Sequence, residues 1–205
     1  MIYNTRLCGV EAFEFEGTRQ PVSVIDFWSW AMSRLVMDGP RGDLAEFIVR
    51  VALSGDIDTP KCGWGEYDID YRGKRVEVKC SSMLQAWRRE TPSAPKFGIA
   101  STTNCMVKQD EAGEWYYHGS DGSPARRRSD LYVFCLFANS DLNTADLLKL
   151  EQWVFWVLAT SVINEQLGER KSITMPLMEK LGAEKLTFSS LKPAVDKLIA
   201  EIETS

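Results

Sequence analysis

The stretch YDIDYRGKRVEVKCSS, from Tyr67 to Ser82, decides the fold expected for this chain. Apolar and charged residues alternate on both sides of Arg72-Gly73, and this pattern predicts two strands joined by a tight turn. Three acids and four bases fall on this one hairpin. The charge is either a solvated sheet face or part of a metal site.

A turn of even length would place Asp70 opposite Arg75 and Asp68 opposite Glu77, and opposed residues share a face. One face then carries Glu66, Asp68, Asp70, Arg75, Glu77 and Lys79, and the other carries Tyr67, Ile69, Tyr71, Val76, Val78 and Cys80. We expect the second, apolar face to pack inward. A turn of odd length would shift the register by one residue and point Glu77 away from Asp68.

The opposed acids Asp68 and Glu77 need an explanation, because like charges across two strands cost roughly 0.2 to 1 kcal/mol. A solvated face with interleaved bases is one interpretation. A divalent cation is the other, since Mg²⁺ binds one or two carboxylates and completes its shell with water and phosphate. Asp68 and Glu77 are then candidate ligands for Mg²⁺ (or Mn²⁺). Lys79, on the same face, would hold the attacking water or stabilise charge on phosphorus.

Length and composition indicate a globular protein. The chain has 205 residues, of which 44% are apolar and 26% charged, enough for one domain with a sizeable core. No stretch reaches the ~18 uncharged apolar residues of a membrane span, and residues 1–17 lack the apolar centre of a signal peptide. We therefore expect a cytoplasmic protein. The net charge of -5 argues against a uniformly nucleic-acid-binding surface but permits a local basic groove.

The scarcity of histidine limits the chemistry that the chain can perform. His118 is the single histidine, which excludes a poly-histidine metal site and disfavours Ser/His/Asp and Cys/His catalysis. The five cysteines form no C-x-x-C pair, so no thiolate zinc site is indicated. Carboxylates and lysine are the expected catalytic groups.

Periodicity and turn signals predict an α/β fold, a mixed central sheet flanked by helices, in which residues 1–205 form a single domain. Residues 1–40 are expected to form an N-terminal helical extension, and residues 161–205 C-terminal helices. The expected elements are helices at Val24–Met37, Leu44–Leu53 (capped by Asp43) and Met83–Arg89, and strands at Lys96–Thr102, Leu131–Ala138 and Gln152–Thr160.

These residues resemble the PD-(D/E)XK nuclease superfamily, which has the restriction-endonuclease-like fold. The resemblance rests on Asp68, on Glu77-Val78-Lys79 in the next strand and on Glu46 in the preceding GDLAEFIV helix, and it covers roughly Gly42 to Trp87. It implies an αβββαβ-type core, here with an added C-terminal helical region, and metal-dependent hydrolysis of nucleic acid. We expect a DNA endonuclease. YDIDYRGKRVEVKCSSMLQAW and RRSDLYVFCLFA are also similar to an uncharacterised group of bacterial proteins.

The resemblance implies a role for each matching residue. Asp68 and Glu77 would be metal ligands, and Lys79 would position water or stabilise charge. Glu46 would be an outer ligand or a proton acceptor, and Gln85 matches a glutamine that several branches of the superfamily carry after this strand.

Two positions depart from the family pattern, and one residue has a second interpretation. Tyr67 stands where the family has proline, and Asp70 competes with Asp68 for the ligand role, although the register favours Asp68. The sequence Asp43-Leu44-Ala45-Glu46 also fits a helix capping box worth about 1 kcal/mol, which alone would explain Glu46.

Arginines outside the hairpin are candidate contacts for phosphate, although charged runs are also often simply solvated. They are Arg88, Arg89, Arg126, Arg127 and Arg128. A duplex cutter would be expected to pair with a second copy as a homodimer, because one active site cuts one strand. The alternative is a catalytically inactive nuclease-fold protein that binds or scaffolds a partner through its polar residues 109–129.

Overall fold

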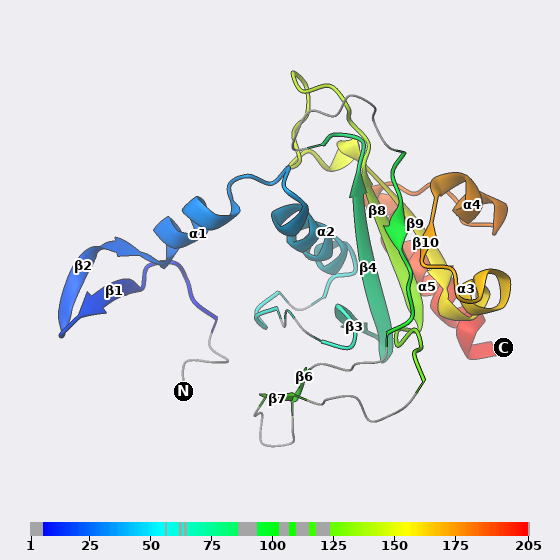
Figure 1. Ribbon diagram of the computed structural model, residues 1–205, viewed down its shortest axis with the longest axis horizontal. Coiled ribbons are helices and arrows are strands. Elements are labelled where there is room, and N and C mark those ends of the chain that lie inside the picture. Colours follow the sequence, from blue (N-terminus) through cyan, green and yellow to red (C-terminus); the bar gives the residue numbers. More distant parts are fainter. Residues whose placement is uncertain are drawn as a thin grey trace.

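The computed structural model describes residues 6–55, 57–61, 63, 65–85, 94–102, 107–109, 115–117 and 124–204, with backbone only for 107–109 and 115–117. A four-stranded sheet lies at the centre, in the order β3-β4-β8-β9 (Figure 1). Its strands are β3 (Ile69–Tyr71), β4 (Lys74–Ser82), β8 (Leu131–Phe137) and β9 (Trp153–Ala159). The β4–β8 pair is parallel and the other two pairs are antiparallel, so the predicted α/β fold with a mixed sheet is confirmed.

The β3–β4 hairpin forms as its sequence predicts. Asp70 pairs with Arg75 across an even-length turn at Arg72-Gly73. Both turn residues have positive φ, 54° and 73°, the conformation that a two-residue turn needs to match the twist of its strands. The apolar face packs inward, with Ile69, Tyr71, Val76 and Val78 buried.

Both faces of the sheet are covered, which explains why every residue of β8 is buried. One face packs against α2 (Asp38–Ala52) and α5 (Phe188–Thr204). The opposite face packs against α3 (Thr160–Leu167), α4 (Met175–Lys180) and a small sheet of β5 (Phe97–Gly98) and β10 (Ser172–Ile173). The sequence predicts a strand at Lys96–Thr102, but only Phe97–Gly98 forms one. This strand, β5, pairs with β10 and lies outside the central sheet.

The predicted start of the second helix is wrong. The helix α2 begins at Asp38, so Asp43 lies inside it and caps nothing. Residues Asp38-Gly39-Pro40, which resemble a turn, form the first helical turn, where proline is tolerated because its missing N–H has no partner there. The buried side of α2 consists of Arg41, Ala45, Ile48 and Val49.

The N-terminal extension contains strands as well as a helix. A hairpin of β1 (Ala12–Phe15) and β2 (Thr18–Ser23) leads into α1 (Val24–Met32), which is shorter than predicted. Figure 1 shows this arm projecting away from the body. All residues of α1 are described, and none of them is buried.

Three helices and a strand follow β9, in the order α3, β10, α4 and α5. The last, α5, is amphipathic and buries Leu191, Val195 and Ile199. The remaining elements are a 3-10 turn, η2 (Leu150–Gln152), and a hairpin of β6 (Val107–Gln109) and β7 (Trp115–Tyr117). Among the described residues, every helix is too short or too polar to span a lipid bilayer.

Candidate active site at the edge of the central sheet

Asp68 lies just before the edge strand β3 and turns its carboxylate onto β4. The regular ladder ends at the Ile69–Val76 pair, one pair short of the predicted Asp68–Glu77 pair. The backbone N–H of Asp68 donates to the carbonyl of Val76 (3.1 Å), and the Asp68 carboxylate accepts a hydrogen bond from the backbone N–H of Val78 (2.6 Å). Asp68 is thereby held across the hairpin beside Glu77.

The surroundings of Asp68 are unfavourable for its charge. Burial, followed by the charges of Glu77 and Glu46, raises the pKa of Asp68 to about 7 from its ordinary 3.8. The amide of Val78 and the ammonium of Lys79 act in the opposite direction. The net effect is an acid whose pKa lies near neutral pH.

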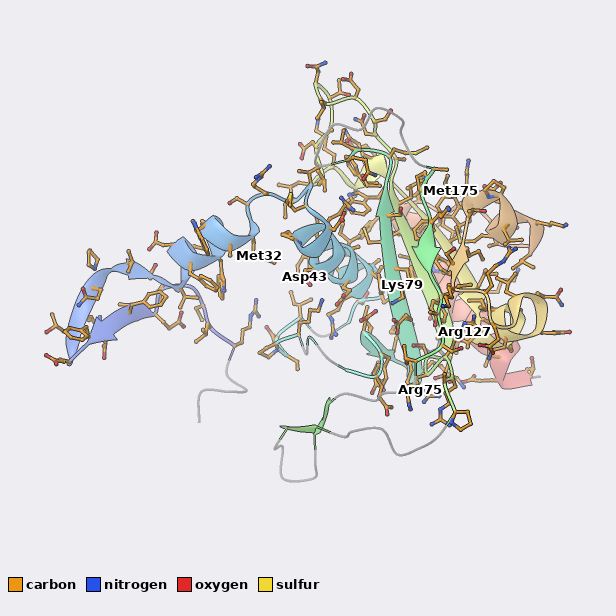
Figure 2. All side chains as sticks on the ribbon, in the orientation of Figure 1. Met32, Asp43, Arg75, Lys79, Arg127 and Met175 are labelled. Carbon is orange, nitrogen blue, oxygen red and sulfur yellow. The ribbon has the colours of Figure 1, made fainter. Side chains whose placement is uncertain are left out.

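Glu77 and Lys79 stand on the same face of β4, as the alternation predicts. The Lys79 Nζ lies 2.5 Å from Glu77 Oε1, and the hydroxyl of Ser129 donates to Glu77 Oε2 at 3.0 Å. Figure 2 shows Lys79 midway along β4. The side chains of Glu77 and Lys79 are 18% and 33% exposed, so solvent reaches both.

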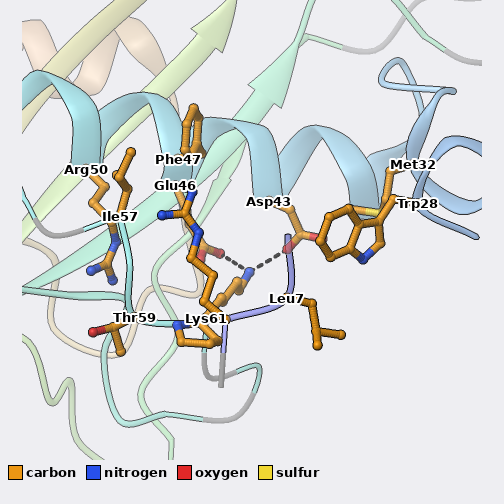
Figure 3. A pocket seen from close by; sticks show the side chains of 12 residues that line it. Leu7, Trp28, Met32, Asp43, Glu46, Phe47, Arg50, Ile57, Thr59 and Lys61 are labelled. Atoms are coloured by element: carbon orange, nitrogen blue, oxygen red, sulfur yellow. Dashed lines mark hydrogen bonds and ion pairs between the residues drawn. The ribbon is translucent and has the colours of Figure 1, made fainter. Parts of the chain in front are cut away.

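Glu46 approaches the same place from α2. Its carboxylate accepts a hydrogen bond from Lys61 Nζ at 2.7 Å, and Lys61 also bonds Asp43 at 2.5 Å (Figure 3). Burial raises the pKa of Glu46, the charges of Asp43 and Glu77 add to this, and Lys61 partly offsets it. Because α2 begins at Asp38, the capping-box interpretation of Glu46 is wrong.

The structure thus brings Glu46, Asp68, Glu77 and Lys79 into one electrostatically coupled cluster at the sheet edge. Within the described part of the chain there is no group of three or more His, Cys, Asp or Glu side chains arranged to hold a metal ion. Each of the three carboxylates has a protein partner instead. The cluster is still chemically suited to a hard cation such as Mg²⁺. Its carboxylate oxygens are the ligands that such a cation prefers, and the cation's charge would offset their mutual repulsion.

Two other predicted positions lie apart from this cluster. Asp70 is exposed and stands opposite Arg75 in the ladder, so the structure favours Asp68 over Asp70 as the site carboxylate. Gln85 donates to the carbonyl of Ser82 (3.2 Å) and lines a separate cavity of about 550 Å³ with Arg41. No described contact joins Gln85 to the cluster.

The three neighbouring arginines Arg126, Arg127 and Arg128 lie in different surroundings. Arg126 is exposed and its backbone pairs with Thr102. Arg127 is 9% exposed, and its guanidinium donates to the carbonyls of Ile99, Gly168 and Arg170 and to the side chain of Asn164 at 2.7 to 3.0 Å (Figure 2). The guanidinium of Arg127 is therefore occupied inside the protein, which does not favour contact with phosphate.

Arg128 is also buried, with its Nη1 3.8 Å from Glu66 Oε1, an ion pair that does not favour phosphate contact. Arg88, Arg89 and His118 lie outside the described residues.

Two residues that the sequence reasoning missed complete the cluster. Lys61 is in a loop with no periodic signal, and Ser129 reaches Glu77 only because β8 lies beside β4 in parallel. Compared with protein-family models and with curated proteins, the chain matches none. The resemblance to PD-(D/E)XK nucleases therefore depends on the residues described above.

Proposed function

We propose that the protein is a divalent-cation-dependent nuclease that hydrolyses phosphodiester bonds, with DNA as the expected substrate and internal cleavage as the expected mode. The observation that supports this proposal is the coupling of Glu46, Asp68 and Glu77 with Lys79 beside them at an accessible sheet edge. A carboxylate such as Asp68, whose pKa is raised by burial and by neighbouring acids, is typical of catalytic sites when a cation lies beside it.

Asp68 and Glu77 would hold the cation. Mg²⁺ commonly uses only one or two protein carboxylates and takes its other ligands from water and phosphate, so a cluster of three acids is not required. When bound, the cation would polarise the scissile phosphate and lower the pKa of a water molecule. It would also offset the charges of Glu77 and Glu46, which add to burial in raising the pKa of Asp68.

Lys79 would stabilise the reaction's developing charge. Its ammonium lies beside Glu77, and a third of the Lys79 side chain is exposed. From there it can donate to the attacking water or to a non-bridging phosphate oxygen, and donors fixed before the reaction stabilise a transition state most effectively. Ser129, which bonds the other oxygen of Glu77, would keep that carboxylate in position.

Glu46 would accept the proton of the attacking water. Burial raises its pKa, and a higher pKa makes its carboxylate a stronger base. As the new oxygen–phosphorus bond forms, the bond to the leaving oxygen breaks, and that oxygen takes a proton from solvent. Lys61, which acts to lower the pKa of Glu46, would favour the ionised form of that carboxylate.

A second candidate function is a nuclease-fold protein that binds nucleic acid or a protein partner without turnover. One observation favours it, because each carboxylate of the cluster already has a protein partner, as expected of a structural ion-pair network. The two candidates differ in whether the cluster hydrolyses a phosphodiester.

Cleavage of supercoiled plasmid and of RNA, with Mg²⁺ or Mn²⁺, tests the proposal. Asp68→Asn, Glu77→Gln and Lys79→Met are expected to lower the rate by roughly 100-fold or more. Asp70→Asn is the matched control, since it removes a carboxylate from the same hairpin outside the cluster, and it should cleave like the wild type. No cleavage by any form, or equal cleavage by all, would favour the second candidate.

A further inference from the structure

A cavity of about 530 Å³ opens beside the cluster, between α1, α2 and residues 57–61 (Figure 3). Its volume lies within the range of small-ligand sites, about 300 to 1,000 Å³. Glu46 is both a wall of this cavity and a member of the cluster. A ligand bound in the cavity would therefore lie next to the proposed reaction centre.

The walls of the cavity are mainly apolar and include two aromatic side chains. Trp28 comes from α1 and Phe47 from α2, and Ile57 and Pro60 add aliphatic surface. Phe47 is 52% exposed although its helix packs on the sheet. An exposed aromatic beside a cavity is typical of a binding surface, because a planar ligand can stack on it.

Polar groups of both signs complete the lining. Asp43 contributes a carboxylate that can accept from an amino or imino N–H. Lys61, which joins Asp43 to Glu46, and Arg50, whose guanidinium donates to the Asp68 carbonyl at 3.1 Å, are cations between the cavity and the cluster. Cations in this place would face the negative backbone of a nucleic acid.

From this arrangement we infer that the cavity binds one unstacked nucleobase of the substrate, next to the scissile phosphate. The inference rests on the proposed function, since it takes the cluster as the place where the phosphate binds. An aromatic wall, a carboxylate acceptor and adjacent cations match the flat face, the N–H groups and the phosphate of a nucleotide. Either a single strand or a base extruded from a duplex would supply the ligand.

Binding is tested in protein that carries Glu77→Gln, in EDTA, so that no turnover occurs. The probe is an oligodeoxynucleotide containing 2-aminopurine, whose fluorescence reports base stacking, with anisotropy to measure affinity. Trp28→Ala and Phe47→Ala are each expected to weaken binding by roughly tenfold or more, as loss of one base–aromatic contact does. Trp28→Phe, which keeps an aromatic ring and tests whether folding is intact, should retain most of the affinity.

Trp30→Ala is the matched control, because Trp30 lies on the same helix, is 83% exposed and is outside the cavity lining among the described residues. Equal affinity of the Trp28→Ala and Trp30→Ala proteins would overturn the inference, and so would tighter binding of a peptide than of the oligonucleotide. Plasmid cleavage separates this result from the proposed function. If the wild type cleaves plasmid but Trp28→Ala does not weaken oligonucleotide binding, the base site is rejected and the nuclease proposal stands. If Trp28→Ala weakens binding but the wild type does not cleave, the nuclease proposal is rejected and the base site stands.

Discussion

The Asp68 carboxylate accepts a 2.6 Å hydrogen bond from the backbone N–H of Val78, one strand away. This bond holds Asp68 beside Glu77 although the regular ladder ends at Ile69. The fold thereby fixes an acid where its negative charge is unfavourable, as the pKa of about 7 for Asp68 indicates. Such an arrangement lowers stability, and it is expected where the charge serves a function.

Stability in the absence of divalent cations should depend on Asp68 and pH in a defined direction. Asp68 titrates near 3.8 when unfolded and near 7 when folded, so the folded state binds more protons between these values. The free energy of unfolding therefore falls as pH rises from about 4 to about 7. Asp68→Asn removes this penalty, and thermal unfolding in EDTA should show a higher Tm than wild type at pH 8.

The same comparison at pH 4 should show a much smaller difference, because folded Asp68 is then protonated and nearly neutral. Asp70→Asn serves as control, since Asp70 is exposed and should leave the Tm unchanged at both pH values. A wild type that is as stable as Asp68→Asn at pH 8 would contradict the assigned environment of Asp68.

Divalent cations should stabilise the folded protein through the same pair of acids. A ligand that binds only the folded state raises stability in proportion to the logarithm of its concentration above Kd. Adding Mg²⁺ or Mn²⁺ at pH 8 should raise the Tm of the wild type and of Asp70→Asn, and leave that of Asp68→Asn and Glu77→Gln unchanged. An equal rise in all four proteins would indicate a cation effect unrelated to the cluster.

Lys61 should set the pH at which activity appears. Its ammonium lowers the pKa of Glu46, so Lys61→Met should raise that pKa further. Activity that needs ionised Glu46 rises with pH through this pKa, and the acid limb of the pH–rate profile should move to higher pH in the variant. Lys197→Met on α5 removes an 80% exposed side chain that is not among the groups acting on Glu46, and it should keep the wild-type limb. An unmoved limb in Lys61→Met would remove Glu46 from the proton-accepting role.

The parts of the fold that the sequence predicts are those with a strong local signal. The hairpin follows from alternation around Arg72-Gly73, and β8 follows from an apolar run that only burial on both faces explains. The start of α2 does not follow, because Asp38-Gly39-Pro40 fits a turn and a first helical turn equally well. Only packing of the helix against the sheet decides between them.

The residues of the candidate site likewise fall into those that the sequence predicts and those that it does not. Asp68, Glu77 and Lys79 are predictable because their spacing on one hairpin puts them close together. Lys61 and Ser129 are not, because their positions depend on the path of a loop and on the parallel pairing of β4 with β8. Such long-range contacts leave no periodic trace in a single sequence.

The arginine run gives the last prediction, because neighbouring Arg126 and Arg127 have opposite surroundings. Arg127→Ala should lower the free energy of unfolding by about 3 kcal/mol, since it removes several buried hydrogen bonds to a charged group. Arg126→Ala should change stability by no more than about 0.5 kcal/mol, as is usual for an exposed position. Urea unfolding measures both values.

Affinity for DNA should show the reverse order. If Arg126 contacts phosphate, Arg126→Ala should weaken binding and reduce the slope of log affinity against log salt concentration by about 1. Arg127→Ala, measured at a temperature where it is fully folded, should keep the wild-type slope, because its guanidinium is occupied inside the protein. A reduced slope for Arg127→Ala with unchanged stability would mean that the buried bonds of Arg127 open when nucleic acid binds.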